Sequence, residues 1–218
     1  MTQTINGPHQ NQKIMTAGRA LDEARAAMIL VHGRGATAES ILSLATELDQ
    51  DDFAYLAPQA AQNTWYPHSF MAPIPNNQPG IDSGLSRLGE LIERIVAASI
   101  PHERIMLLGF SQGACLATEF VVRHARRYGG VVGLSGGLIG PPGTTWGYEG
   151  SLDETAVFLG CSDIDFHIPK ERVEETAVVM KQMGGSVTMR LYPGMGHTVN
   201  QDEIDFVRHM MAQVAALR

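Results

Sequence analysis

Short apolar runs separated by longer amphipathic stretches constrain the fold of this chain most strongly. Most of the runs are apolar at consecutive positions, as are strands that are buried on both faces of a parallel sheet. The sequence therefore predicts parallel strands over Ala26–Val31, Phe53–Ala57, Arg104–Gly109, Gly130–Leu134, Ala156–Leu159 and Val187–Leu191.

The stretches between the runs have the three- and four-residue spacing of helices with one apolar face. The predicted helices are Ala38–Leu48, Ile81–Ala98, Gln112–Arg127, Lys170–Met183 and Asp202–Leu217. Strands and helices that alternate in this way predict an α/β fold, with one mostly parallel sheet covered by helices on both faces. Ligands of such folds bind at the carboxyl ends of the strands.

Length and composition predict a single domain over residues 1–218, because no linker or repeat divides the chain. Residues 1–20 are weakly patterned, and either add an edge strand or stay loose. They lack a signal-peptide pattern, and no apolar stretch is long enough to span a membrane, so we expect a cytoplasmic protein without stable membrane insertion. A net charge of -7 argues against nucleic-acid binding. Cys115 and Cys161 are predicted to be buried free thiols.

The most specific motif is G-x-S-x-G at residues 109–113, between a predicted strand and a predicted helix. A sharp turn in this context exposes only its serine, Ser111, and the glycines relieve the clashes that side chains would cause. The amide of Gln112, at the start of the helix, faces the place where an oxyanion would form. The motif therefore predicts a nucleophilic serine.

A serine nucleophile needs a base, and His197 has the most informative setting of the eight histidines. It follows the last predicted strand through a glycine-rich loop, at the same edge of the sheet as Ser111. His32 is interpreted as structural, with bonds to the backbone of its loop. The four other histidines in polar or helical settings are read as surface residues: His9, His102, His124 and His209.

The third catalytic group should be a carboxylate that orients the histidine, and both Asp163 and Asp165 follow the strand that ends at Leu159. Asp163 is favoured because it is closer to the predicted strand end. The chain order Ser, Asp, His is that of α/β-hydrolases. The D-x-D-x-H run could instead bind a cation, but no fourth ligand is evident, so no metal site is predicted.

A second oxyanion donor is expected after an early strand, and the amide of Arg34 within 32–35 has that place. Gly33 lets the backbone approach the substrate. The same segment also matches a dinucleotide-binding pattern, Gly33-x-Gly35-x-x-Ala38. That alternative needs an acid at the end of the next strand, which instead ends at Ala57-Pro58. No cofactor is predicted.

These motifs resemble those of the phospholipase/carboxylesterase family of α/β-hydrolases, from about Ala26 to near the C-terminus. The matching segments are Val31-His32-Gly33-x-Gly35, Ala57-Pro58, residues 109–113, Leu134-Ser135-Gly136, Gly160-x-x-Asp163 and residues 194–197. The resemblance implies an α/β-hydrolase without a large cap domain and a Ser111, Asp163 and His197 triad. Arg34 departs from the apolar residue usual in the family, and Asp165 fits the spacing D-x-x-[VI]-P.

Two long unpatterned connections are predicted to supply the substrate site, because such loops in compact domains are more often binding loops than filler. They span residues 59–80 and 137–150. Together with Gly33 and Met195, beside His197, the predicted substrate-binding residues in them are Trp65, Tyr66, Phe70, Met71, Leu138 and Trp146.

These residues predict a serine carboxylesterase that acts through an acyl-enzyme. The resemblance implies that its esters have short to medium acyl chains. The alternatives are an acyl-protein or acyl-CoA thioesterase or lysophospholipase, and, more remotely, an inactive hydrolase-fold binding module. The expected partner is a small-molecule ester, and the expected assembly is a monomer or a homodimer.

Overall fold

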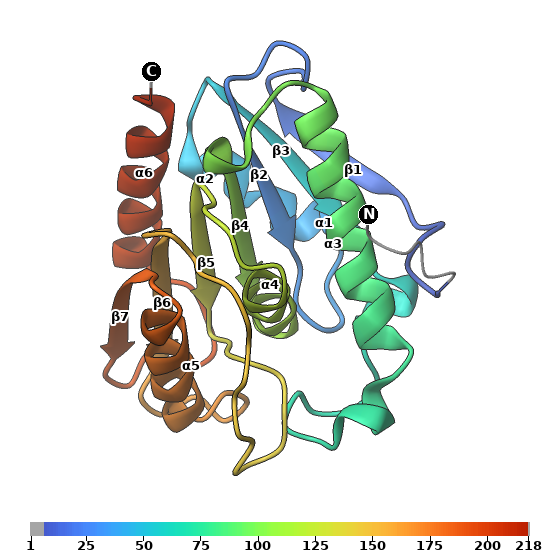
Figure 1. Ribbon diagram of the computed structural model, residues 1–218, viewed down its shortest axis with the longest axis vertical. Coiled ribbons are helices and arrows are strands. Elements are labelled where there is room, and N and C mark those ends of the chain that lie inside the picture. The colour runs from blue at the N-terminus through green and yellow to red at the C-terminus, as the bar shows by residue number, and fades with distance from the viewer. Residues whose placement is uncertain (1–6, 218) are drawn as a thin grey trace.

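A computed structural model describes residues 7–217 and contains one seven-stranded sheet in the order β1-β3-β2-β4-β5-β6-β7 (Figure 1). The strands are β1 Ile14–Gly18, β2 Ala26–Val31, β3 Phe53–Pro58, β4 Ile105–Phe110, β5 Gly130–Leu134, β6 Ala156–Ser162 and β7 Ser186–Tyr192. The helices are α1 Ala38–Leu42, α2 Leu44–Leu48, α3 Gly80–Ala97, α4 Gln112–Arg123, α5 Lys170–Gln182 and α6 Gln201–Ala215.

Six of the strands are parallel, and β1 pairs antiparallel with β3 at one edge. The predicted α/β-hydrolase fold class is confirmed. Residues 1–20 were expected to add an edge strand or to stay loose, and Ile14–Gly18 forms the edge strand β1. Residues 1–6 lie outside the described residues. The five inner strands, β2 to β6, are buried on both faces, as is typical of parallel strands with helices on each side of the sheet.

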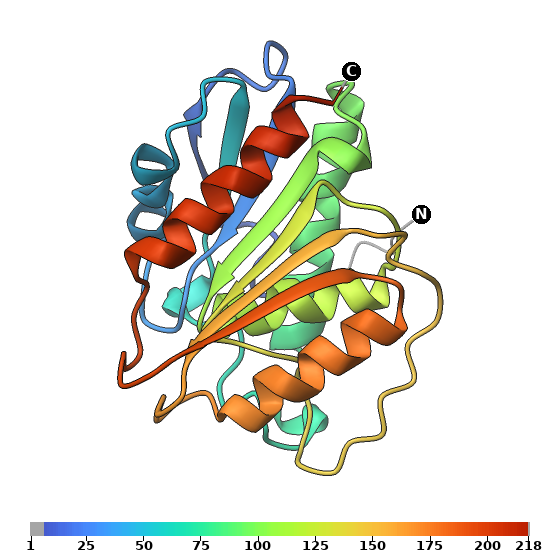
Figure 2. The same cartoon turned by 90° about the vertical axis from the view of Figure 1, so that its left-hand side faces the viewer.

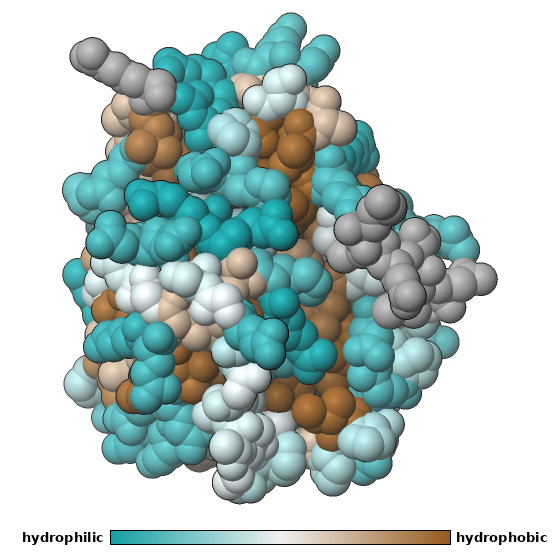
Figure 3. Space-filling model, viewed as in Figure 1, coloured by the Kyte–Doolittle hydropathy of each residue, from teal (hydrophilic) through white to brown (hydrophobic). Residues whose placement is uncertain are grey.

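Alternate side chains of β2 show how the two layers are built. Ala27, Ile29 and Val31 join the core cluster under α3, α4 and α5, whereas Met28 and Leu30 join the cluster under α1, α2 and α6. Figure 1 shows the first helix layer in front of the sheet, and Figure 2 shows α6 across its other face. Mainly hydrophilic residues cover the outer surface of the first layer (Figure 3). An inner strand of such a sheet therefore has no polar face.

Most predicted bounds lie within one or two residues of the observed ones, and the larger differences are at three places. The helix predicted over 38–48 divides at Ser43 into α1 and α2. The helix predicted over 112–127 ends at Arg123, where the backbone of His124 leaves the helical region. Strand β6 runs through Ser162, three residues beyond its predicted end, because β7 pairs with it as far as Tyr192. Cys115 and Cys161 are free and buried, as predicted.

The two long connections meet at the carboxyl edge of the sheet, at the lower end of the molecule in Figure 1. The segment between β3 and α3 contacts the segment after β5, since the Gly140 amide donates to the Phe70 carbonyl over 2.9 Å. In the described chain, none of the helices has the length and apolar character that a membrane crossing would need.

A buried glutamate joins the start of α6 to strand β6. Glu203 forms a capping box with Asn200, in which each residue's side chain accepts from the other's backbone amide. Its side chain lies against Gly160 of β6, where an added Cβ would come within 2.1 Å of Oε1. This Oε1 is buried without a hydrogen-bond partner. Burial raises the pKa of Glu203 to about 7, although the amide of Asn200 opposes the shift.

The titration of Glu203 predicts a pH-dependent stability. The folded protein holds this proton to a higher pH than the unfolded chain does, with its ordinary pKa of 4.5. The resulting stabilisation is therefore present below about pH 4.5 and is lost as the pH rises through about 7. Glu203→Gln cannot ionise, so its free energy of unfolding should fall less over this interval.

Urea denaturation at intervals from pH 4.5 to pH 8 measures this difference. Glu171→Gln, at an exposed position on α5, is the matched control and should follow the wild-type curve. Parallel curves for the wild type and Glu203→Gln would contradict the prediction.

Candidate active site

Ser111 stands at the turn between β4 and α4, with φ 55° and ψ -122°. Glycines on either side make this turn possible. A Cβ at position 113 would lie 2.1 Å from the Val31 carbonyl oxygen, and one at position 109 would lie 2.3 Å from that of Gly113. Such strained backbone persists only where the surrounding structure enforces it. The close packing of β2, β4 and α4 therefore enforces the sharp turn that G-x-S-x-G predicts.

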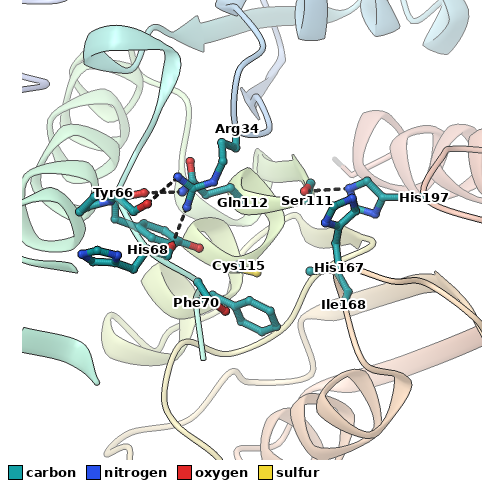
Figure 4. Close-up of a pocket in the computed structure, with 12 residues that line it drawn as sticks. Arg34, Tyr66, His68, Phe70, Ser111, Gln112, Cys115, His167, Ile168 and His197 are labelled. Atoms are coloured by element: carbon teal, nitrogen blue, oxygen red, sulfur yellow. Dashed lines mark hydrogen bonds between the residues drawn. The ribbon is translucent and has the colours of Figure 1, made fainter. Parts of the chain in front are cut away.

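His197 comes from the loop between β7 and α6, and its ring faces the Ser111 hydroxyl (Figure 4). Its Nδ1 is 2.6 Å from Asp165 Oδ2, and its Nε2 is 2.9 Å from Ser111 Oγ. Because a carboxylate only accepts hydrogen bonds, the ring proton belongs on Nδ1. This leaves Nε2 free to accept the proton of the Ser111 hydroxyl.

Asp165 occupies the place that the sequence assigned to Asp163, and the choice of Asp163 is corrected in this respect. The Asp163 carboxylate instead accepts from the Gly194 amide over 2.8 Å and holds the loop that carries His197. The choice was based on a strand that ended at Leu159. Because β6 continues through Ser162, Asp163 is the first residue after the strand and Asp165 lies in the turn beyond. The D-x-x-[VI]-P spacing was the signal for Asp165.

The side chain of Asp165 is fully shielded from solvent. Burial raises the pKa of this carboxyl, but the hydrogen bond from His197 and those from the amides of His167 and Ile168 lower it, and the net pKa lies below the ordinary value. The two amides approach Oδ1, whereas Oδ2 faces the imidazole. Asp165 is therefore held charged in one orientation beneath the ring.

Arg34 and Gln112, the two residues predicted to supply oxyanion amides, border the same cavity as Ser111. The first amides of a helix have no partner within the helix, and Gln112 begins α4. The Gln112 side chain accepts from the Trp65 amide and donates to the Tyr66 carbonyl. These bonds hold the loop after β3 over the start of the helix.

The cavity has a volume of about 390 Å³, which is near the small end of the range for small-molecule sites. Of the predicted substrate-binding residues, Tyr66 and Phe70 line it. Ser111, His197 and the two predicted amide donors line it too. Six further residues complete the lining: Pro67, His68, Ser69, Cys115, His167 and Ile168. These six were missed because nothing in the sequence distinguishes a loop residue that faces the serine from its neighbours.

Six predicted substrate-binding residues do not line this cavity. Trp65 and Leu138 are completely buried in the core, and the Trp65 indole donates to the His32 carbonyl. Met71 packs against the core cluster. The sulfur of Met195 accepts a hydrogen bond from the side-chain amide of Asn200. The remaining two, Gly33 and Trp146, border separate surface depressions. The loops use much of their apolar bulk for their own packing.

His32 is structural, as predicted, because Nδ1 bonds to the Gly33 carbonyl and Nε2 accepts from the Ala60 amide. The prediction that His9 is a surface residue is wrong. This side chain is 1% exposed, accepts from the Ala61 amide and donates to the Trp65 carbonyl. Its polar surroundings in the sequence gave no sign of this burial.

The geometry allows a proton to move from the Ser111 hydroxyl to an imidazole that a buried carboxylate supports. This is the arrangement that turns an alcohol into a nucleophile for acyl transfer. Among residues 7–217, no group of three or more His, Cys, Asp and Glu side chains is placed to hold a metal ion. Both carboxylates of the D-x-D-x-H run have other partners: Asp163 accepts from the Gly194 amide, and Asp165 contacts His197.

The chain is similar to known phospholipases and carboxylesterases. A family model described as phospholipase/carboxylesterase matches residues 17–215. A crystal structure of a phospholipase/carboxylesterase from Dyadobacter fermentans is 42% identical, covers 93% of this chain and 97% of its own, and superposes with a TM-score of 0.89.

Curated relatives are more distant. Acyl-protein thioesterase 1 of Eremothecium gossypii is 28% identical, with 88% of each chain covered. Acyl-protein thioesterase 1 of Gibberella zeae is 31% identical, but the match covers 59% of this chain and only 55% of that protein's length.

The contact between Gly113 and Val31 predicts the effect of one added methyl group. Gly113→Ala forces a Cβ against a backbone carbonyl that cannot rotate away. We expect the free energy of unfolding to fall by roughly 1–3 kcal/mol or more, as in other overpacked cores. Urea denaturation measures the change.

Gly147→Ala is the matched control, because its added Cβ meets no atom within 4 Å. It should unfold close to the wild-type midpoint. If Gly113→Ala were as stable as Gly147→Ala, the close packing under the serine would not constrain the turn.

Proposed function

Because this chain belongs to the phospholipase/carboxylesterase family, we propose that it is a serine hydrolase that cleaves short- to medium-chain carboxylic esters through an acyl-enzyme. The hydrogen-bonded series Ser111, His197 and Asp165 is the observation that carries the proposal. The limited volume of the adjoining cavity supports the restriction on acyl length.

In the proposed first step, Ser111 Oγ attacks the ester carbonyl carbon while His197 Nε2 takes its proton. The negative charge on the carbonyl oxygen is stabilised by the amides of Arg34 and Gln112. Asp165 keeps the imidazole in the required tautomer and stabilises its protonated form. The carbon–oxygen bond to the alcohol then breaks, and the departing alcohol takes the proton from His197.

The second step repeats this chemistry with water in place of the alcohol. His197 removes a proton from a water molecule as its oxygen attacks the acyl-enzyme carbonyl. Collapse of the second tetrahedral intermediate breaks the bond to Ser111 Oγ, which recovers its proton from His197. The acid is released and the enzyme is restored, so the proposed cycle needs no cofactor.

A thioester substrate is a second candidate, because two of the relatives are named acyl-protein thioesterase 1. The same attack by Ser111 would cleave a thioester. Cleavage of a series of esters and acyl-CoA thioesters of increasing chain length distinguishes these substrates, since the cavity bordered by Phe70 and Ile168 has room for only a limited acyl group.

Removal of the nucleophile or the base should abolish most of the activity. His197→Ala should lower kcat/KM for p-nitrophenyl butyrate by about 100- to 10,000-fold or more, because positioned proton transfer alone contributes this much. Ser111→Ala should lose at least as much, because it removes the attacking oxygen. Initial rates measure the loss, and circular dichroism verifies folding.

His209→Ala, at an exposed position on α6, serves as the control and should keep wild-type activity. A fluorophosphonate should label the wild type and not Ser111→Ala. Full turnover in both active-site variants would refute the mechanism, and an unlabelled, inactive wild type would favour a binding module.

The two aspartates should differ sharply in their effects. Asp165→Asn should lower kcat by about 10,000-fold, because an amide favours the wrong tautomer of His197. Asp163→Asn keeps an oxygen that can accept from the Gly194 amide, so we expect a much smaller loss. Rates for both variants on p-nitrophenyl butyrate test this. A larger loss in Asp163→Asn would return the acid's role to that residue.

A further inference from the structure

The cavity beside Ser111 has an unusual charge for this protein. The molecule carries a net charge of -7, yet the residues that line the cavity include the cation Arg34 and no aspartate or glutamate. Among residues 7–217, the ion pairs within 4 Å involve other side chains, and Arg34 belongs to none of them. A cation thus borders the reaction site without a neutralising carboxylate.

Neutral oxygens hold the Arg34 guanidinium in place. Nη1 donates to the Pro67 carbonyl over 2.9 Å, and Nη2 donates to the His68 carbonyl over 2.6 Å. The group also lies 6.0 Å from the centre of the Tyr66 ring (Figure 4). A guanidinium has five N–H donors. The two carbonyls fix its direction and leave both its charge and further donors available to a ligand.

A second polar group, the Tyr66 hydroxyl, lies behind the same wall. It is buried in a residue that is 2% exposed, and its neighbour is the Cys115 thiol, a weak hydrogen-bonding group. Its side chain points toward Cys115 in the cavity (Figure 4). Burial raises the pKa of Tyr66 well above its usual range, and burial also raises the pKa of Cys115 to about 12, so both groups stay protonated. Neither group therefore adds a negative charge to the wall that carries Arg34.

We infer that the cavity accepts an ester that carries a carboxylate a short distance from its scissile carbonyl, such as a monoester of a short dicarboxylic acid, and that Arg34 selects it. The inference rests on the proposed function. The backbone amide of Arg34 is proposed to bind the carbonyl oxygen, so its side chain starts at the reacting group. A carboxylate on a short spacer can therefore reach the guanidinium while the carbonyl faces Ser111.

Selection by charge is distinct from a purely structural role of Arg34 as a brace for residues 67 and 68. A brace affects all substrates alike, since it acts through the shape of the loop. A charge changes the ratio between an anionic and a neutral substrate of the same shape. The ratio is therefore the quantity to measure, and it does not depend on how much activity a variant retains.

The matched substrates are monomethyl succinate and methyl succinamate, whose carboxylate and amide have nearly the same shape. The wild type should prefer the carboxylate in kcat/KM by about two- to fivefold at low ionic strength, the range for a solvent-accessible ion pair. Added sodium chloride should reduce this preference, because salt screens the attraction. Ester cleavage is followed by titration of the acid that is released.

Variants assign the preference to one residue. In Arg34→Gln the ratio should fall to about one or below, whereas Arg34→Lys, which keeps the charge but loses the two-pronged hold, should keep a preference for the carboxylate. Arg208→Gln, at an exposed position on α6, removes a remote positive charge and should leave the ratio unchanged.

The outcomes separate this inference from the proposed function. An equal ratio in the wild type and Arg34→Gln, or a salt-independent ratio near one in the wild type, would overturn the inference while ester hydrolysis stands. Turnover of p-nitrophenyl butyrate without turnover of monomethyl succinate would overturn it too. Failure to cleave any ester, with no labelling of Ser111, would instead refute the proposed function.

Discussion

The close approach of α4 to the end of β2 is the constraint on which the site depends. Position 113 has no room for any side chain beyond hydrogen, because the Val31 carbonyl lies where a Cβ would stand. The helix therefore begins immediately after the strand, and Ser111 is left at φ 55°. The unfavourable conformation of one residue is maintained by the burial of a strand and helix on both sides of it.

Three loops at the carboxyl edge of the sheet bring the other groups of the site to Ser111. The loop after β7 brings His197 and is tied down by Asp163 at one end and by the capping box of Glu203 at the other. The turn after β6 brings Asp165 in a fixed orientation. The loop after β3 is held by Gln112. Most of these bonds engage backbone groups, so the Ser111 hydroxyl and Nε2 of His197 remain free to bond to each other.

The charged and the aromatic side chains at this edge of the sheet are held in different ways. The Asp165 carboxylate is buried and compensated by amides and the imidazole of His197, whereas the Arg34 guanidinium is anchored by neutral carbonyls. The aromatic residues of the same loops divide between the two purposes, since Trp65 completes the core while Phe70 faces the cavity. Composition alone does not separate these roles, because both need an apolar side chain in a loop.

The sequence by itself determined the α/β architecture, the serine turn and the position of His197 beside Ser111. Apolar runs and the spacing of glycines are local signals, and each fits few structures. The sequence did not determine which aspartate lies beneath the histidine, that His9 is buried, or which loop residues face Ser111. These depended on how far β6 pairs with β7 and on how two distant loops pack together. Such contacts join residues far apart in the chain, so only the tertiary structure decided them.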